Sequence, residues 1–186
     1  MTRPADVYLL HGQGGAATSE GIDYIDRQIN GWNLPDINAW VWDWGSWEEL
    51  RDFADQRAGS NRLRFGIGYS MGGNGFTWVL GGVAYQGNSA PGVQAVVFDH
   101  VSFLDPTWAS VLTPLTPPHL RAARHFKNHS FDPIGHGELK AISPQFPNLE
   151  VIDISTSHFL VDKSPYVQQM TLNTIWNAIH APEATT

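Results

Sequence analysis

Short apolar runs recur along the chain at intervals that suit the strands of a covered sheet. They lie at residues 7–10, 39–42, 64–69, 95–98, 124–130 and 150–155. Most are almost continuously apolar, as in VYLL and AVVF, which is typical of parallel strands buried on both faces. The pattern therefore predicts a sheet of about six strands.

Between these runs the apolar residues recur every three or four positions, which predicts helices. Ile22, Ile25 and Ile29 follow this spacing after the first run, and Ser46 with Glu49 has the spacing of a capping box that starts a second helix. Both segments therefore read as helices with one buried face.

The last helix is predicted to begin at Ser164-Pro165, because proline is favoured in the first turn of a helix. Its expected buried residues are Leu172, Ile175, Trp176 and Ile179. Strands that alternate with helices predict a doubly wound α/β fold, with a mostly parallel sheet and helices on both faces. With no repeat or long linker, we expect residues 1–186 to form a single domain.

Composition narrows the possible partners and compartments. The 186 residues include 42% hydrophobic and 16% charged residues, as in a globular domain, and the net charge of −7 argues against nucleic acid as a partner. No apolar stretch is long enough to span a membrane and the N-terminus does not resemble a signal peptide, so we expect a cytoplasmic protein. The sequence leaves the oligomeric state open.

Metal and thiol chemistry are not expected. The chain has no cysteine, which excludes disulfides and a cysteine nucleophile. His125 and His129 are four residues apart, but on a strand that offset separates them by about 13 Å, too far for one ion. No metal ligands and no cofactor are therefore predicted.

One serine stands at the junction of a predicted strand and a predicted helix. The segment Gly68-Tyr69-Ser70-Met71-Gly72 fits the pattern GxSxG, in which glycines allow a sharp turn that exposes the serine hydroxyl. A serine is a useful nucleophile only if a base removes its proton and a third group orients that base. Ser70 is thus the predicted nucleophile.

The sequence supplies a base and an acid after later strands. His158 follows the last predicted strand and Asp132 follows the strand before it, so both should lie with Ser70 at the carboxyl edge of the sheet. We predict His158 as the base and prefer Asp132 as the acid, because their strands should be neighbours. Asp99 and Asp105, near the end of the fourth predicted strand, are alternatives for the acid.

Catalysis by a serine also needs N–H donors for the oxyanion. The residue after the nucleophile, Met71, and the glycine-rich loop after the first strand, most simply at Gln13, are the expected donors. The expected substrate-binding residues are Gly12 in that loop, Tyr69 beside the nucleophile, Trp44 after the second strand and Phe159 at the rim of the site.

Taken together, these motifs resemble the α/β-hydrolase superfamily, and in particular its small, lidless, cutinase-like esterases. The His11-Gly12 loop, the GYSMGG segment and the order Ser70, Asp132, His158 carry this resemblance over nearly the whole chain. It implies an acyl-enzyme on Ser70 and a small-molecule ester as substrate. Two features depart from the family: the glycine loop follows the first strand rather than a later one, and no cap domain is present.

Two other functions remain open from the sequence. Residues 12–17 also fit GxGxxA after a first strand, and Asp43 ends the next strand, as in a dinucleotide-binding reductase or binding module. A hydrolase fold that only binds a ligand is the other alternative. The predicted function is a serine carboxylic-ester hydrolase, because only that reading uses Ser70, Asp132 and His158.

Overall fold

The computed structural model describes residues 2–59, 61–81, 95–107, 114–115, 119–129, 140–141 and 148–182. Six strands form one sheet in the order β2-β1-β3-β4-β6-β8, and all neighbouring pairs are parallel. Their bounds are β1 Ala5–Leu10, β2 Ile37–Trp42, β3 Leu63–Tyr69, β4 His100–Leu104, β6 Ala123–Asn128 and β8 Leu149–Ile154. A separate parallel pair joins β5 (Pro114–Leu115) to β7 (Lys140–Ala141). The predicted parallel sheet of six strands is confirmed.

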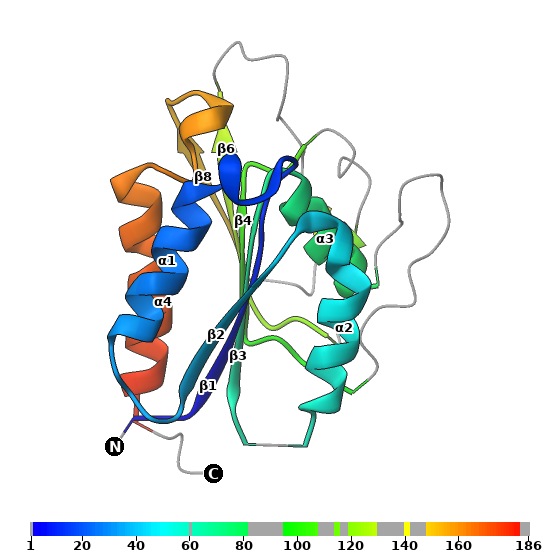
Figure 1. Cartoon of the computed structure of the whole chain (residues 1–186), viewed down its shortest axis with the longest axis vertical. Helices are drawn as coiled ribbons and strands as arrows, with labels where there is room; N and C mark the ends of the chain where they lie inside the picture. Colours follow the sequence, from blue (N-terminus) through cyan, green and yellow to red (C-terminus); the bar gives the residue numbers. More distant parts are fainter. Residues whose placement is uncertain are drawn as a thin grey trace.

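Helices cover both faces of the sheet, as predicted. Helices α1 (Glu20–Gly31) and α4 (Pro165–His180) lie on one face, and α2 (Trp47–Gln56) and α3 (Met71–Val79) lie on the other (Figure 1). Short 3₁₀ turns lie in the described loops: η1 (Gly15–Ala17), η2 (Trp44–Ser46) and η4 (His158–Leu160).

Strand β1, the second from one edge of the sheet, is buried on both faces because its residues alternate between two cores. Val7 and Leu9 pack in the cluster that includes α1 and α4, whereas Tyr8 and Leu10 pack in the cluster that includes α2 and α3. A strand between two apolar layers needs apolar residues at every position, which explains the continuous run VYLL.

The fourth strand is not where the sequence analysis placed it. The apolar run 95–98 contributes Val96 and Phe98 to the core, but Phe98 forms only an isolated bridge to Leu120. The strand itself is β4, which starts two residues later at His100. The prediction was wrong because a residue can be buried in the core without belonging to a strand that pairs with its neighbours.

Two details of the predicted helices also differ. Helix α2 follows Ser46 as expected, but the Ser46 side chain makes no capping hydrogen bond. Trp176 was expected to be buried in α4, yet it is 41% exposed and packs edge-on against Trp32, the residue directly after α1. Trp176 therefore covers the seam between α1 and α4 rather than entering the core.

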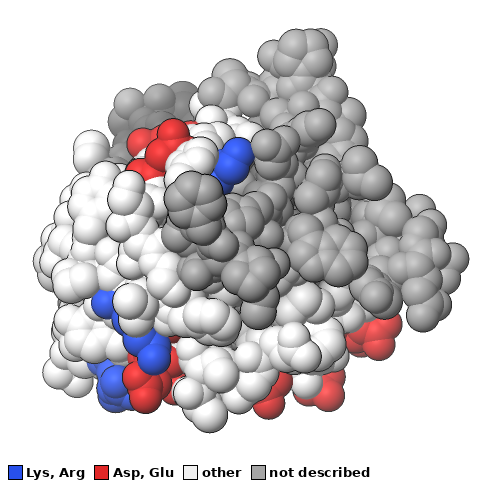
Figure 2. All heavy atoms as spheres, turned by 90° about the horizontal axis from the view of Figure 1, so that it is seen from above, with Lys and Arg blue, Asp and Glu red and all other residues white. Residues whose placement is uncertain are grey.

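The carboxyl ends of the strands meet at the top of the molecule in Figure 1, and this end holds the loops that follow β1, β3, β4 and β8. Figure 2 looks down on this end: over the described residues the surface is mostly uncharged, with a few small groups of charged side chains, one of which contains both acidic and basic residues. Among the helices in the described ranges, none has the length and apolarity to cross a bilayer.

Candidate active site

Ser70 lies in a sharp turn between β3 and α3, where its backbone has a positive φ of 53° with ψ −121°. Neighbouring glycines make this turn possible. A Cβ on Gly68 would lie 2.5 Å from the Gly72 carbonyl oxygen, and one on Gly72 would lie 2.4 Å from the carbonyl oxygens of Leu10 and His11. Strand and helix can therefore approach closely, as the GxSxG pattern predicts.

His158 and Ser70, 88 residues apart in the chain, are in hydrogen-bond contact. Nε2 of His158 lies 2.9 Å from Oγ of Ser70, and Nδ1 lies 2.7 Å from Oδ2 of Asp105. An ionised carboxylate only accepts, so the contact with Asp105 requires a hydrogen on Nδ1. Nε2 can then accept from the Ser70 hydroxyl. All three side chains are buried.

The carboxylate beside His158 is thus Asp105, which the sequence analysis held as an alternative. Asp105 follows the last residue of β4, and its Oδ1 also accepts the Asn128 N–H at 3.3 Å. The preferred acid, Asp132, lies outside the described residues. Asp99 lies at the other end of β4, where it accepts from the Arg64 N–H and from Arg121. The observed contact favours Asp105 over both.

Tyr69 contacts His158 and also lines the cavity at Ser70. Its hydroxyl donates to the His158 carbonyl oxygen at 2.9 Å, and its ring stacks against the imidazole with the centroids 5.4 Å apart. Burial raises the pKa of Tyr69, aided by the charges of Asp162 and Asp105, so the hydroxyl keeps the proton that it donates. The sequence offered no signal for this contact.

A small cavity opens at Ser70. Its volume is about 130 Å³, and the described residues that line it are Gln13, Thr18, Tyr69, Ser70, His158 and Phe159. The Phe159 side chain is 54% exposed at this opening, where the sequence analysis expected it. The Gln13 loop is fixed by a hydrogen bond from the Thr18 hydroxyl to the Gln13 carbonyl oxygen at 2.7 Å.

The remaining expected site residues are Met71, Gly12 and Trp44, and each lies differently with respect to Ser70. Met71 begins α3, so its N–H is one of those with no acceptor within the helix. Gly12 packs behind the nucleophile, since a Cβ there would lie 3.1 Å from Cβ of Ser70, and its N–H donates to Oγ of Ser19. Trp44 lies in η2 and is not among the described residues that line the cavity.

Asp43, the ribose-binding candidate of the dinucleotide reading, has a partner within the chain. His11 bridges two carboxylates, with Nδ1 3.1 Å from Asp43 and Nε2 2.8 Å from Asp23 of α1. At the start of α1, the Gly21 N–H donates to the Asp162 carboxylate at 2.9 Å. Asp43 and the Gly12 N–H, two of the groups expected to bind a dinucleotide, thus contact other parts of the protein.

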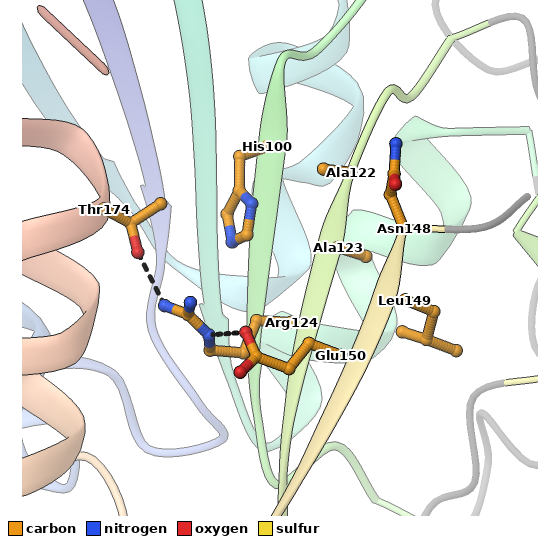
Figure 3. A pocket seen from close by; sticks show the side chains of 8 residues that line it. All are labelled: His100, Ala122, Ala123, Arg124, Asn148, Leu149, Glu150 and Thr174. Atoms are coloured by element: carbon orange, nitrogen blue, oxygen red, sulfur yellow. Dashed lines mark hydrogen bonds and ion pairs between the residues drawn. The ribbon is translucent and has the colours of Figure 1, made fainter. Parts of the chain in front are cut away.

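A second cavity, of about 360 Å³, lies at the amino ends of β4, β6 and β8, far from Ser70 along the strands (Figure 3). Arg124 crosses it and donates to Glu150 at 2.7 Å and to Thr174 at 2.6 Å. Burial and the nearby Arg124 charge lower the pKa of His100 to about 4, so this histidine is neutral at pH 7. These groups lie too far away to join chemistry at Ser70.

Over the described ranges, no group of three or more histidine, aspartate or glutamate side chains is arranged to hold a metal ion. Ser70, His158 and Asp105 are hydrogen-bonded one after another, which is the arrangement required for proton transfer rather than for metal coordination.

Comparison with known proteins identifies the fold. No family model and no curated protein matches the chain. Among solved structures, acyl-protein thioesterase 2 from Zea mays is similar with a TM-score of 0.53 and 15% identity, over 96% of this chain and 95% of that one. A thermophilic esterase from Thermogutta terrifontis with butyrate bound gives a TM-score of 0.55 and 11% identity, over 98% and 87%.

The catalytic core domain of acetyl xylan esterase from Trichoderma reesei is similar as well, with a TM-score of 0.50 and 12% identity over 96% of this chain and 100% of that one. With the parallel sheet of six strands, these likenesses show that the chain has the α/β-hydrolase fold.

Proposed function

We propose that the protein is a serine hydrolase that cleaves carboxylic esters of small molecules through an acyl-enzyme on Ser70. The observation that carries this proposal is the unbroken chain of hydrogen bonds from Ser70 through His158 to Asp105. The structural neighbours include two esterases and a thioesterase, which favours ester chemistry. No cofactor is required.

In the first step, the Ser70 oxygen attacks the carbonyl carbon of the ester while its proton moves to Nε2 of His158. Asp105 holds the proton on Nδ1 and stabilises the positive charge that develops on the ring. The N–H groups of Met71 and Gln13 are the proposed donors to the oxyanion.

The tetrahedral intermediate then collapses: the bond to the alcohol oxygen breaks and His158 gives that oxygen its proton. In the second half of the reaction water attacks the acyl carbon while its proton moves to Nε2 of His158. The bond between the acyl carbon and the Ser70 oxygen then breaks, which releases the carboxylic acid, and His158 returns the proton to Ser70. Phe159 offers an apolar contact for the substrate at the mouth of the cavity.

The test combines a mechanism-based label with turnover of an activated ester. A fluorophosphonate should label the folded protein at Ser70, and Ser70→Ala should lose the label and lower turnover of a p-nitrophenyl ester by roughly 10³-fold or more. Ser164→Ala is the control, because Ser164 precedes α4 and its side chain makes no capping hydrogen bond. It should behave like the wild type.

Two results would contradict the proposal. Full activity in Ser70→Ala would remove this residue from the mechanism. A correctly folded wild-type protein that is neither labelled nor active on any ester would instead favour a hydrolase fold that only binds a ligand.

A further inference from the structure

The segment that follows His158 ends in a buried acid that the proposed reaction does not use. Asp162 is 0% exposed, and its Oδ2 accepts the N–H of Gly21 in the first turn of α1 at 2.9 Å. The other carboxylate oxygen, Oδ1, is buried without a hydrogen-bond partner. An acceptor at a helix N-terminus satisfies an N–H that has no partner inside the helix. Asp162 therefore attaches the His158 segment to α1.

The backbone contact at this point is unusually close. A Cβ on Gly21 would lie 2.0 Å from the Asp162 carbonyl oxygen, so only glycine fits between the two segments. That same carbonyl oxygen accepts from Nε2 of Gln168 in α4 at 2.9 Å. The His158 segment, α1 and α4 thus meet at Asp162.

The start of α1 also holds the loop expected to bind the oxyanion. Ser19, directly before α1, accepts the Gly12 N–H through its hydroxyl at 2.8 Å. One helix end therefore contacts both sides of the cavity at Ser70: the Gln13 loop through Ser19, and the His158 segment through Gly21.

The His158 segment is held at two ends. Tyr69 fixes the carbonyl of His158, and Gly21 fixes the carboxylate of Asp162 four residues later. Without the second contact the short turn η4 can pivot about the first, which would shift the imidazole away from Ser70. A displacement of about 1 Å in a catalytic group can lower the rate by roughly a hundredfold.

We propose that Asp162 is a positioning residue for the base, acting through its contact with Gly21 to hold His158 at Ser70. This inference rests on the proposed serine hydrolase function. It adds that the N-terminus of α1 fixes the two sides of the site relative to each other.

The experiment compares two substitutions at Asp162. Asp162→Ala removes the acceptor, and we expect kcat and the rate of fluorophosphonate labelling to fall at least tenfold, with KM within about twofold, because a displaced base affects the transition state and not substrate binding. Asp162→Asn keeps an oxygen that can accept the Gly21 N–H. Its kcat should stay within about threefold of the wild type, since the hydrogen bond is retained.

A nearby ion pair supplies the matched control. Lys163 and Glu20 join the same two segments at the surface, with Nζ 3.1 Å from Oε2. Because exposed pairs contribute little, Lys163→Ala should keep the wild-type kcat and labelling rate. If the alanine variant at Asp162 fails to fold, as judged by near-UV circular dichroism, Asp162→Cys takes its place, since cysteine is of similar size and a poor acceptor.

The outcomes separate the inference from the function on which it rests. If the fluorophosphonate labels the wild type and the Asp162→Ala or Asp162→Cys variant equally fast, only the role of Asp162 is overturned. Equal losses in the asparagine and acceptor-free variants, or an equal loss in Lys163→Ala, would overturn it too. A wild type that is neither labelled nor active would remove the proposed function itself, and the role of Asp162 with it.

Discussion

Two buried residues at the carboxyl edge of the sheet have positive φ angles without being glycine. Ser70 has φ 53° and Asp105 has φ 44°, and each directly follows its strand. Such conformations cost on the order of 1 kcal/mol or more for a residue with a Cβ, and they persist where the surroundings hold them. The hydrogen bonds of both side chains to His158 give a reason to keep these residue types in place of glycine.

Asp105→Asn tests which acid orients the base. An amide beside Nδ1 can donate as well as accept, so it no longer selects the tautomer that leaves Nε2 free for Ser70. We expect kcat on a p-nitrophenyl ester to fall by about 10³- to 10⁴-fold with the fold retained, by analogy with the same change in a serine protease triad.

Asp132→Asn, measured in parallel, should stay within about threefold of the wild type, because the observed partner of Nδ1 is Asp105. The reverse ranking of the two variants would restore Asp132 as the acid.

For individual residues, the sequence is informative where a function requires a recognisable pattern of residue types close together in the chain. The glycines around Ser70 predicted the turn, and His158 was predicted from its place after the last strand. Asp105 was not preferred, because its strand was not expected to neighbour the strand before His158. In the sheet β6 does lie between β4 and β8, yet the Asp105 carboxylate reaches Nδ1 of His158. Once β4 ends at Leu104, Asp105 occupies the same place after β4 as Ser70 does after β3.

Among the elements, β4 shows the limit of reading strands from apolar runs. The segment His100–Leu104 contains a histidine and a serine, and Ser102 is only 2% exposed. A ladder needs only backbone N–H and C=O groups, so polar residues can occupy a buried strand while an adjacent apolar run lies outside the ladder. Trp176 fits the helical spacing equally well, yet it is exposed, because spacing alone does not define how wide the buried face of a helix is.

Helix α1 offers two glycines that should respond in opposite ways to alanine. At Gly21 the new Cβ would overlap the Asp162 backbone at 2.0 Å, so Gly21→Ala should lower the free energy of unfolding by roughly 2 kcal/mol or more. At Gly31 a Cβ meets nothing within 4 Å, and Gly31→Ala should be neutral or stabilising by up to about 1 kcal/mol, since alanine favours helices.

Urea denaturation of the two variants and the wild type measures both effects. Equal stabilities for Gly21→Ala and Gly31→Ala would show that α1 and the His158 segment are not in the close contact described above.

For the whole molecule, the two ends of the sheet carry different kinds of polar cluster. At the amino end, the buried Asp6 accepts from Arg57 at 3.0 Å and from Arg62 at 2.8 Å, which joins β1 to the segment between α2 and β3. Burial opposes ionisation there, but these hydrogen bonds and charges keep the pKa of Asp6 below its usual value. The carboxyl end carries Ser70, His158, Asp105 and Asp162 instead. The buried Asp6 cluster and the proposed chemistry therefore lie at opposite ends of the strands.

Asp162 should make the stability of the protein depend on pH in mildly acidic solution. Burial raises its pKa from 3.8 to about 6, against the opposing hydrogen bond from Gly21 and the charge of Lys163. The folded protein therefore binds this proton more tightly than the unfolded chain. The resulting stability is complete below pH 3.8 and is lost as the pH rises through 6, a change of about 3 kcal/mol.

Urea denaturation between pH 3.5 and 7 should show this loss as a difference between the wild type and Asp162→Asn, which has no carboxyl group to titrate at this position. The other acids, Asp6 among them, are common to both proteins and cancel in the difference. Parallel curves for the two proteins across this window would contradict the raised pKa.

The pairing of Tyr69 with Leu104 in the parallel register of β3 and β4 has an evolutionary consequence. Because the next residue on each strand carries the proposed nucleophile or acid, inserting or deleting a single amino acid within β4 would displace the acid by about 3.3 Å and turn it toward the opposite layer of helices. We therefore expect related sequences to vary in the length of the loops beyond Asp105 far more than in the number of residues in β4.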